Sequence, residues 1–334
     1  MSASLAKPRV AKLALAHRPT PIERYPALDA LVGTEVWIKR DDATGGADAG
    51  NKIRKLEYLM AGAQQARAQV VITCGAVQSN HARATAIAAR RLGMQPELFL
   101  REEADAGPRR VEGNLLLDTL LGAELTFIDR AAYGRRDALM AERAQRHADA
   151  GRRAFVIPEG GSNGLGALGY WDAMAETRAQ LDAAAGELPD RFDAVLHACG
   201  SGGTAAGAVL GAGACEIASE VIAVAVCDDR AYFEARITSI LTDAEGYFSA
   251  PPPRAALRVL DAYKGPAYGV PSSEQISFIR ETARRTGLLL DPVYSGKALF
   301  ALAQLPDKPA RVLFIHTGGL PGLLAEHARF THDA

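Results

Sequence analysis

The chain has 334 residues, and its 38 basic against 39 acidic residues give a formal net charge of −1; without a basic stripe or an acidic tail, nucleic acid and anionic membrane surfaces are poor candidate partners. No apolar run approaches the roughly 18 residues that a membrane-spanning helix needs, and the N-terminus lacks a secretion signature. The four cysteines form no Cys-x-x-Cys pair and have no histidine at metal-ligand spacing, so we expect a cytoplasmic protein with neither disulfides nor a metal site.

Short β-branched runs alternate along the chain with stretches of helical periodicity. Strands are predicted at residues 35–40, 70–73, 97–100, 125–128, 154–157, 194–197, 221–226 and 312–315. Helices are predicted from residue 52 and at about 80–92, 111–121, 135–149, 170–184 and 272–285, whereas 228–270 show no clear pattern. This alternation is typical of an α/β fold whose parallel sheets are covered by helices on both faces. A chain of this length is also expected to form two lobes.

The polar, glycine-rich segments of the chain all follow predicted strands. They come after Arg40, Thr73, Ile157, His197 and Ile315. In parallel α/β sheets, ligands bind beyond the carboxyl ends of the strands, where such loops gather. We therefore expect these loops to form one binding site.

Lys52 lies where the loop after the first predicted strand meets a helix. Asn51 is a candidate N-cap, so the Lys52 ammonium would sit in the first turn, where the helix dipole disfavours a positive charge. A lysine in that position loses its proton more readily, as a nucleophilic lysine must. An ordinary solvated lysine is the alternative that this stretch alone leaves open.

A glycine turn, Gly200-Ser201-Gly202-Gly203-Thr204, stands between a predicted strand and a helix. The N–H groups of such a turn can converge on an anion at the helix N-terminus, which predicts a phosphate site. Together with Ala205, the turn also matches the dinucleotide-binding fingerprint, and Asp228 and Asp229 end the next strand. A nicotinamide-dependent oxidoreductase is therefore a competing interpretation, although it gives Lys52 no role.

Further polar side chains follow other predicted strands. Gln78-Ser79-Asn80-His81 precedes a helix that Ser79 or Asn80 can cap, and the free N–H groups there could hold a carboxylate. Tyr294 could stack on a flat cofactor or transfer a proton, and Thr317 offers a hydroxyl after the last strand. Each feature also has a purely structural explanation. No acid is placed to complete a serine-hydrolase triad.

A nucleophilic lysine, a phosphate site and a tyrosine are the parts that a pyridoxal-phosphate enzyme needs. Taken together, the motifs resemble the D-cysteine desulfhydrase and aminocyclopropane-carboxylate deaminase family. The similarity runs from Thr20-Pro21-Ile22-Glu23-Arg24 to Gly319-Leu320-Pro321-Gly322. Its most specific pieces are Ile38-Lys39-Arg40-Asp41-Asp42, Gly50-Asn51-Lys52, Gln78-Ser79-Asn80-His81, Pro158-Glu159-Gly160-Gly161-Ser162-Asn163, Asp291-Pro292-Val293-Tyr294 and His316-Thr317-Gly318-Gly319.

This resemblance implies the tryptophan-synthase-β-like fold (fold type II), with two open, twisted, mostly parallel sheets. It implies a small α/β domain at residues 58–165, inserted into a large cofactor-binding domain formed by 1–57 and 166–334. We expect a homodimer that binds pyridoxal 5′-phosphate and takes a small amino acid as its substrate.

The resemblance also implies roles for single residues. Lys52 would bind the cofactor covalently, Asn80 would reach its phenolic oxygen, and Tyr294 would stack on its ring. The expected cofactor contacts are Lys52, Asn80, Gly200, Ser201, Gly202, Gly203, Thr204, Tyr294, Ser295 and Thr317. The expected substrate contacts are Gln78, Ser79, Asn80, His81 and Tyr268, and the expected catalytic residues are Lys52, Ser79, Tyr268 and Tyr294.

One position discriminates within the family. The ring-opening deaminases characteristically carry Glu directly after the stacking tyrosine, near the pyridine nitrogen, whereas the desulfhydrases have a hydroxyl residue; here it is Ser295. A carboxylate would keep that nitrogen protonated, whereas a hydroxyl favours a neutral ring, which suffices when the leaving group is good.

We therefore expect a β-eliminating carbon–sulfur lyase that converts D-cysteine to pyruvate, hydrogen sulfide and ammonia. Cysteate sulfo-lyase, D-serine or chloroalanine elimination and aminocyclopropane-carboxylate deaminase stay open on the same scaffold. An NAD-dependent oxidoreductase is the remote alternative.

Overall fold

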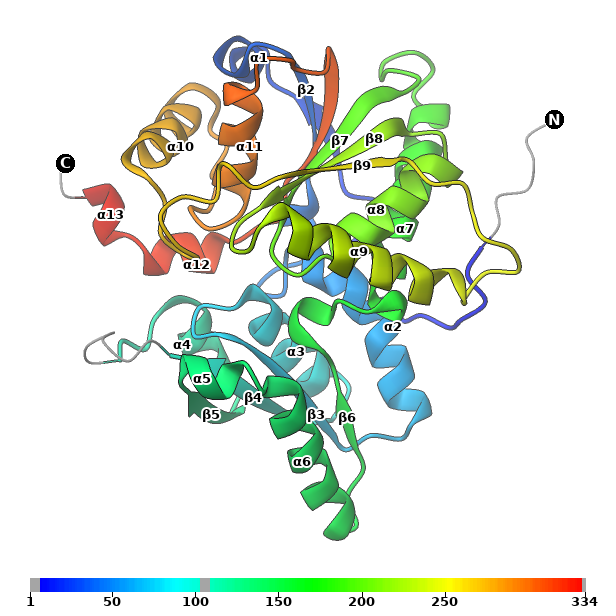
Figure 1. Cartoon of the computed structure of the whole chain (residues 1–334), viewed down its shortest axis with the longest axis vertical. Coiled ribbons are helices and arrows are strands. Elements are labelled where there is room, and N and C mark those ends of the chain that lie inside the picture. The colour runs from blue at the N-terminus through cyan, green and yellow to red at the C-terminus, as the bar shows by residue number, and fades with distance from the viewer. Residues whose placement is uncertain (1–6, 103–108, 332–334) are drawn as a thin grey trace.

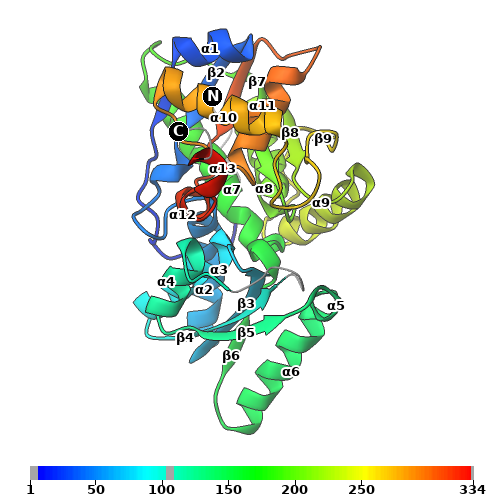
Figure 2. The ribbon, with the colours of Figure 1, turned by 90° about the vertical axis from the view of Figure 1, so that its left-hand side faces the viewer.

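The computed structural model describes residues 7–102 and 109–331. Two β-sheets form its framework, a six-stranded sheet in the upper part of Figure 1 and a four-stranded sheet in the lower part. Figure 2 shows the same division from the side, with the strands of the smaller sheet below α7 and α8. The expected α/β class with two mostly parallel sheets is confirmed.

The larger sheet has the order β1-β2-β10-β7-β8-β9. Its strands are β1 (Ile22–Arg24), β2 (Glu35–Lys39), β7 (Phe192–Cys199), β8 (Ala218–Ala225), β9 (Ala256–Leu260) and β10 (Arg311–Ile315). Only β1 pairs in the antiparallel sense, with β2, and every other pairing in this sheet is parallel. The carboxyl ends of β2, β10, β7 and β8 therefore point to the same edge.

Helices cover both faces of the larger sheet. They are α1 (Pro26–Val32), α7 (Gly164–Ala183), α8 (Gly203–Ala214), α9 (Arg230–Glu245), α10 (Ser273–Thr286) and α11 (Ser295–Gln304), followed by the short α12 (Leu320–Ala325) and α13 (Ala328–Thr331). Alternate residues of β10 enter different cores: Leu313 and Ile315 pack with α7, α8 and α9, whereas Val312 and Phe314 pack with α1, α10 and α11. Side chains alternate along a strand, so a strand apolar at every position is buried on both faces.

The smaller sheet has the order β5-β4-β3-β6, and all its pairings are parallel. Its strands are β3 (Val70–Ala76), β4 (Gln95–Arg101), β5 (Glu124–Ile128) and β6 (Ala154–Val156). The accompanying helices are α2 (Asn51–Gln65), α3 (Asn80–Arg91), α4 (Gly113–Leu120), α5 (Arg130–Tyr133) and α6 (Arg136–Asp149), with 3-10 turns at Asp41–Ala43 and Glu159–Gly161. Helix α2 packs against both α7 and α3, so it links the two sheets.

The sequence did not reveal every element. Residues 228–270, which show no clear pattern, contain α9 and β9. The buried residues of α9 do form one stripe, but the exposed Ala231, Tyr232 and Ala235 add apolar residues to its other faces and obscure the pattern; the stripe is Phe233, Ile237, Ile240, Leu241 and Ala244. The expected domain boundary between residues 57 and 58 falls inside the continuous helix α2; the division into two domains stays a prediction.

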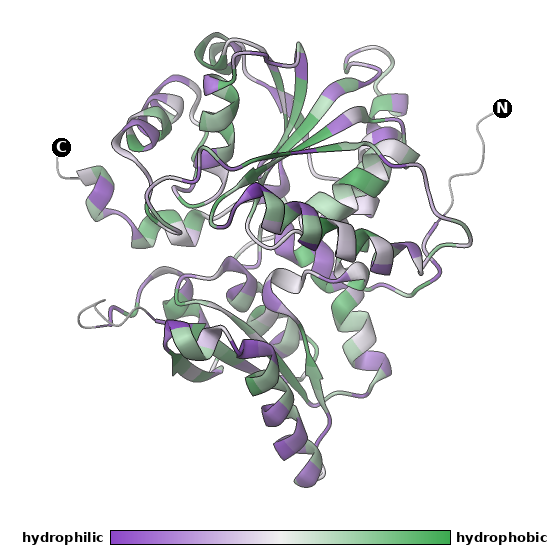
Figure 3. Cartoon of the chain, in the orientation of Figure 1, coloured by the Kyte–Doolittle hydropathy of each residue, from purple (hydrophilic) through white to green (hydrophobic). Residues whose placement is uncertain are grey.

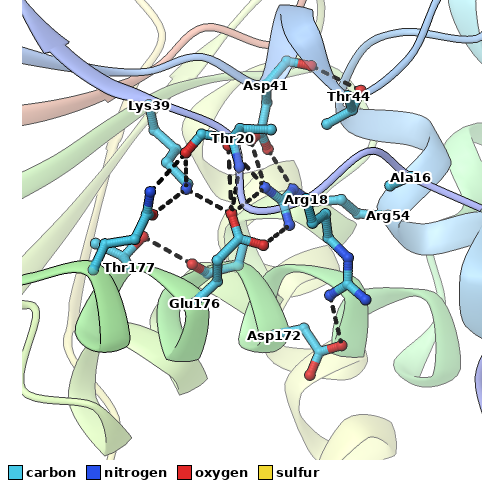
Figure 4. Close-up of polar contacts among 12 residues, drawn as sticks. Ala16, Arg18, Thr20, Lys39, Asp41, Thr44, Arg54, Asp172, Glu176 and Thr177 are labelled. Atoms are coloured by element: carbon cyan, nitrogen blue, oxygen red, sulfur yellow. Dashed lines mark hydrogen bonds and ion pairs between the residues drawn. The ribbon is translucent and has the colours of Figure 1, made fainter. Parts of the chain in front are cut away.

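A buried charge network fixes α2 against the larger sheet (Figure 4). Arg54, whose exposed fraction is 1%, donates to both carboxylate oxygens of Asp41 at 2.8 Å and to both of Glu176 at 3.0 Å. Lys39, at the end of β2, donates to Glu176 Oε1 at 2.6 Å. Arg54 lies two residues after Lys52, so this network holds the turn of helix from which Lys52 projects.

The hydropathy pattern follows these layers. Figure 3 shows apolar residues concentrated along the central strands and polar residues along the outer faces of helices such as α6 and α10. Within the described residues, no helix combines the length and apolar character needed to cross a membrane.

Candidate active site

A cavity of about 390 Å³ opens at the carboxyl ends of β3 and β7. It is lined from both halves of the molecule, with Ser79 and Arg101 from the side of the smaller sheet and Gly200 and Tyr294 from the side of the larger one. A deeper, narrower cavity adjoins it and extends to Asn80, Thr204 and Thr317. Lys52 lines both cavities. The prediction that the loops after the strands gather at one place is thus confirmed.

Lys52 occupies the first turn of α2, as the sequence predicted, but the cap of this helix was assigned wrongly. Gly50 is the N-cap residue, and Asn51 is the first helical residue. A side chain at position 50 is excluded because its Cβ would lie 2.8 Å from the carbonyl oxygen of Thr317, at a φ of +121°. The Asn51 amide is instead free to donate to Thr204 Oγ1 at 3.1 Å. Asn51 therefore connects the start of α2 to the start of α8.

The electrostatic setting of Lys52 makes its amine easier to deprotonate than that of a solvated lysine. Burial lowers the pKa of Lys52 to about 8, against the smaller opposing effects of Cys199 and Glu159. Its ammonium makes no hydrogen bond or ion pair with any described residue. A neutral lysine amine that faces a cavity is a competent nucleophile towards a carbonyl carbon.

The glycine turn, residues 200–204, forms a cup at the start of α8. The Gly203 N–H donates to Ser162 Oγ at 3.2 Å, and Ser162 Oγ also lies 2.8 Å from Ser201 Oγ. Lys55 lies behind this cup. Its Nζ donates to Ser162 Oγ at 3.3 Å and to the Gly160 carbonyl at 3.1 Å, and burial lowers the pKa of this amine well below its usual range. The N–H groups at a helix N-terminus are suited to bind a phosphate group, and a phosphate bound there would favour the charged form of the adjacent Lys55.

Lys55 and Ser162 were given no role by the sequence. Lys55 lies three residues after Lys52, and residues three apart share a face of a helix, which is the signal that could have found it. Ser162 belongs to the glycine-rich segment after β6, which the sequence placed among the loops of the site without assigning a contact to Ser162. That segment reaches the cup because its Gly160 and Gly161 both adopt positive φ angles.

Of the residues from Gln78 to His81, all but Gln78 line one of the two cavities. Ser79 caps α3 by accepting the Ala82 N–H at 3.1 Å, as predicted, and it lines the larger cavity with His81. Burial lowers the pKa of His81 well below its usual range, and Nε2 lies 2.9 Å from Thr73 Oγ1. The structure does not bring Gln78 into either cavity. Gln78 lines a neighbouring groove, and its amide bonds to the backbone of Glu112 and Asn114.

Two tyrosines meet above the cavity. The hydroxyl oxygens of Tyr268 and Tyr294 are 2.5 Å apart, and their rings contact edge to face. Burial raises the pKa of Tyr268 to about 12, and burial raises that of Tyr294 well above its usual range. Both hydroxyls therefore stay protonated at neutral pH, so this pair can donate a hydrogen bond but does not act as a base.

The other predicted cofactor contacts lie around this centre. Thr317 lines the deeper cavity beside Asn80. Ser295 lies directly behind Tyr294, is 1% exposed and lines neither cavity; its hydroxyl donates to Asp291 Oδ1 at 2.6 Å. The roles assigned to these residues by resemblance stay predictions.

Residues 13–318 match the family described as pyridoxal-phosphate dependent enzyme. The chain belongs to this family. It is 42% identical over 320 residues to the mitochondrial bifunctional D-cysteine desulfhydrase/1-aminocyclopropane-1-carboxylate deaminase of Arabidopsis thaliana, covering 92% of this chain and 78% of that protein. It is 38% identical over 327 residues to D-cysteine desulfhydrase of Yersinia pestis, covering 95% and 96%. The structure resembles a crystal structure of an ACC deaminase homologue, with a TM-score of 0.85, 35% identity and coverage of 97% and 95%.

Membership of the pyridoxal-phosphate dependent enzymes confirms the predicted cofactor and fold type, and the site fits that cofactor. Lys52 supplies an amine of lowered pKa for its aldehyde, and the cup at the start of α8, with Lys55 behind it, supplies N–H groups for its phosphate. Position 203 has no room for a side chain, because a Cβ there would lie 2.7 Å from Ser162 Oγ.

Membership of the pyridoxal-phosphate dependent enzymes also rules against the alternative interpretation, a nicotinamide-dependent oxidoreductase. The acids that suggested it do not act as a pair in the structure. Asp229 is the N-cap of α9 and accepts the Tyr232 N–H at 2.9 Å, whereas Asp228 lines the larger cavity. The glycine pattern was shared because both classes place a phosphate at a helix N-terminus.

We expect Gly203→Ala to weaken cofactor binding about tenfold or more, the effect of losing one hydrogen bond to a charged group. The added Cβ would lie 2.7 Å from Ser162 Oγ and 2.9 Å from Lys55 Nζ, so both groups would have to move away from the cup. Cofactor affinity can be measured by titrating the cofactor-free protein and following absorbance. Gly46→Ala is the matched control, because nothing lies within 4 Å of its Cβ position. Equal affinities of the two variants would contradict the assignment of the cup.

Proposed function

We propose that this pyridoxal-phosphate dependent lyase catalyses β-elimination from D-cysteine, with uptake of one water, to give pyruvate, hydrogen sulfide and ammonia. The observation that carries the choice of substrate is Ser295, directly after Tyr294, where a ring-opening enzyme is expected to have a carboxylate. Asp291, the acid on the same loop, is occupied by the N–H groups of Val293, Tyr294 and Ser295 and by the Ser295 hydroxyl. Neither residue therefore offers an ionised group to a pyridine nitrogen.

The bound cofactor supplies an electron sink for the carbanion that forms at the substrate α-carbon. The chain supplies the positioning. We assign the substrate carboxylate to Ser79 and the start of α3, where no described residue accepts the N–H groups of Asn80 and His81. Ser79 Oγ already accepts the Ala82 N–H, so its own proton remains free to be donated to the carboxylate.

We assign proton removal from the α-carbon to Lys52 rather than to a tyrosine. The pKa of Lys52, about 8, leaves roughly a tenth of the amine neutral at pH 7 and more above it, whereas the pKa of Tyr268, about 12, keeps that hydroxyl protonated. A general base works best when its pKa is close to the working pH. The protonated pair of Tyr268 and Tyr294 is instead suited to donate a hydrogen bond to the departing thiolate.

Opening of 1-aminocyclopropane-1-carboxylate is the second candidate, because one relative carries both activities in its name and a solved relative is described as an ACC deaminase homologue. A panel that includes 1-aminocyclopropane-1-carboxylate and the D and L forms of cysteine, serine, cysteate and chloroalanine tests both. Pyruvate and sulfide from D-cysteine support the proposal, whereas 2-oxobutyrate from the cyclopropane acid at a comparable kcat/KM would contradict it.

We expect Ser295→Glu to lower kcat/KM for D-cysteine and to raise it for 1-aminocyclopropane-1-carboxylate, each by about tenfold. The introduced carboxylate would raise the pKa of a nearby pyridine nitrogen and so strengthen the electron sink, which ring opening requires. Ser295→Thr, which keeps a hydroxyl, is the matched control and should leave the ratio of the two kcat/KM values within about threefold. An unchanged ratio in the glutamate variant would remove the argument from Ser295.

We also propose that the enzyme works as a cytoplasmic homodimer with the small domain at residues 58–165. All four cysteines are free thiols, which agrees with a reducing compartment. Size-exclusion chromatography with light scattering tests the oligomeric state.

A further inference from the structure

Two residues that line neither cavity form hydrogen bonds with the side-chain amide of Asn80. Asn80 Oδ1 accepts from Asn114 Nδ2 at 3.1 Å and from Arg83 Nη1 at 3.5 Å. Arg83 Nη1 also donates to Asn114 Oδ1 at 3.1 Å. Both supporting residues are buried, Asn114 with an exposed fraction of 0% and Arg83 with 1%.

These contacts determine the orientation of both side-chain amides, that is, the direction in which the oxygen and the nitrogen of each one point. A guanidinium has donors only, so the atom of Asn114 that faces Arg83 must be its oxygen, and its nitrogen is turned towards Asn80 and the Gln78 carbonyl, 3.0 Å away. The atom of Asn80 that faces this nitrogen must then be its oxygen. Asn80 Nδ2 is consequently left to the deeper cavity, which Asn80 lines together with Lys52.

Arg83 remains a donor at neutral pH. Burial lowers the pKa of Arg83, the charge of Asp118 on α4 opposes this effect, and the resulting value of about 10 keeps the guanidinium protonated. Its second nitrogen, Nη2, donates to the Ala49 carbonyl at 2.8 Å, in the loop that leads to Lys52. Arg83 therefore ties the segment that carries Asn80 to the segment that carries Lys52.

We propose that Arg83 and Asn114 are positioning residues that fix the polarity of the Asn80 amide, so that an N–H donor and not a carbonyl oxygen faces the bound cofactor. The cofactor's phenolic oxygen is an acceptor, and a donated hydrogen bond stabilises its ionised form. This inference rests on the proposed function, because it concerns how the same site holds the cofactor.

Asn114→Asp tests the proposal with a change of a single atom. An aspartate can still accept from Arg83, but it presents an acceptor to Asn80, so the Asn80 amide should turn and direct its oxygen into the cavity. Ionised phenols absorb at longer wavelength than neutral ones. We therefore expect the ratio of visible to near-ultraviolet absorbance of the cofactor-saturated variant to fall about tenfold at constant pH, the effect of one hydrogen bond to an ionised group.

The ratio separates a positioning role from a merely structural one, because lower occupancy reduces both bands in proportion. Asn163→Asp is the matched control: Asn163 caps α7 through its oxygen only, accepting the Gly166 N–H, and should leave the ratio unchanged. Equal ratios in Asn114→Asp and the wild type would overturn the proposal. A wild-type protein without any cofactor band would instead overturn the proposed function.

A second pair of variants decides the question if Asn114→Asp does not fold. Arg83→Lys keeps a residue that can only donate, whereas Arg83→Gln has an amide that can present either atom to Asn114. We expect Arg83→Lys to keep a band ratio within about twofold of the wild type and Arg83→Gln to lower it severalfold. Identical ratios in these two variants, at cofactor saturation, would overturn the proposal.

Discussion

Lys52→Ala is expected to abolish turnover and to remove the visible absorption band of the bound cofactor. The amine of Lys52 is the group that the cofactor aldehyde needs, and it lines both cavities with a pKa lowered by burial to about 8. Loss of the nucleophile and of the base for the α-proton in one step should reduce kcat by about four orders of magnitude or more. Pyruvate release from D-cysteine and the absorption spectrum measure the two effects.

Lys308→Ala is the matched control for this variant. Lys308 lies in the loop before β10, and its ammonium donates to the Leu305 carbonyl, outside both cavities. It should keep the wild-type spectrum and turnover. A Lys52→Ala protein that retained both the band and the activity would overturn the assignment of Lys52.

Arg54→Met is expected to lower the free energy of unfolding by about 3–5 kcal/mol, the effect of removing one partner of a buried ion pair. Arg54 donates to the carboxylates of Asp41 and Glu176, and without it both acids would remain buried with one cation fewer. Urea unfolding followed by circular dichroism measures the change. Arg285→Met is the matched control, because Arg285 pairs with Glu281 on the surface of α10 and should cost less than about 1 kcal/mol.

The pH dependence of stability should show the same network. Although burial raises the pKa of Glu176, the hydrogen bonds and charge of Arg54, together with Lys39, lower it from 4.5 to about 2. A carboxyl whose folded-state pKa is depressed stabilises the protein fully above pH 4.5. This contribution is lost as the pH falls from 4.5 to about 2. In Arg54→Met the pKa of Glu176 should be higher, so ionised Glu176 should contribute less to the free energy of unfolding. If plots of unfolding free energy against pH ran parallel for variant and wild type, this account would be contradicted.

The sequence by itself determined the class of the fold and the centre of the site. Alternating strands and helices predicted parallel sheets, because only strands buried on both faces are apolar at nearly every position. The glycine turn at Gly200 and the lysine at residue 52 were also readable, because both depend on local backbone geometry at a helix start. The ordered motifs then indicated the family that the comparison confirmed.

The tertiary structure decided which side chains support that centre. Lys55 and Ser162 meet at the cup from segments 107 residues apart, and Asn114 reaches Asn80 from another helix, 34 residues away. No local pattern records such contacts, since they depend on how α2, α3, α4 and the segment after β6 pack. The same packing places Gln78 in a neighbouring groove. It also makes Gly50, and not Asn51, the N-cap residue of α2. Chemistry carried by one short segment could thus be read from the sequence, whereas hydrogen-bond polarity and charge pairing required the assembled fold.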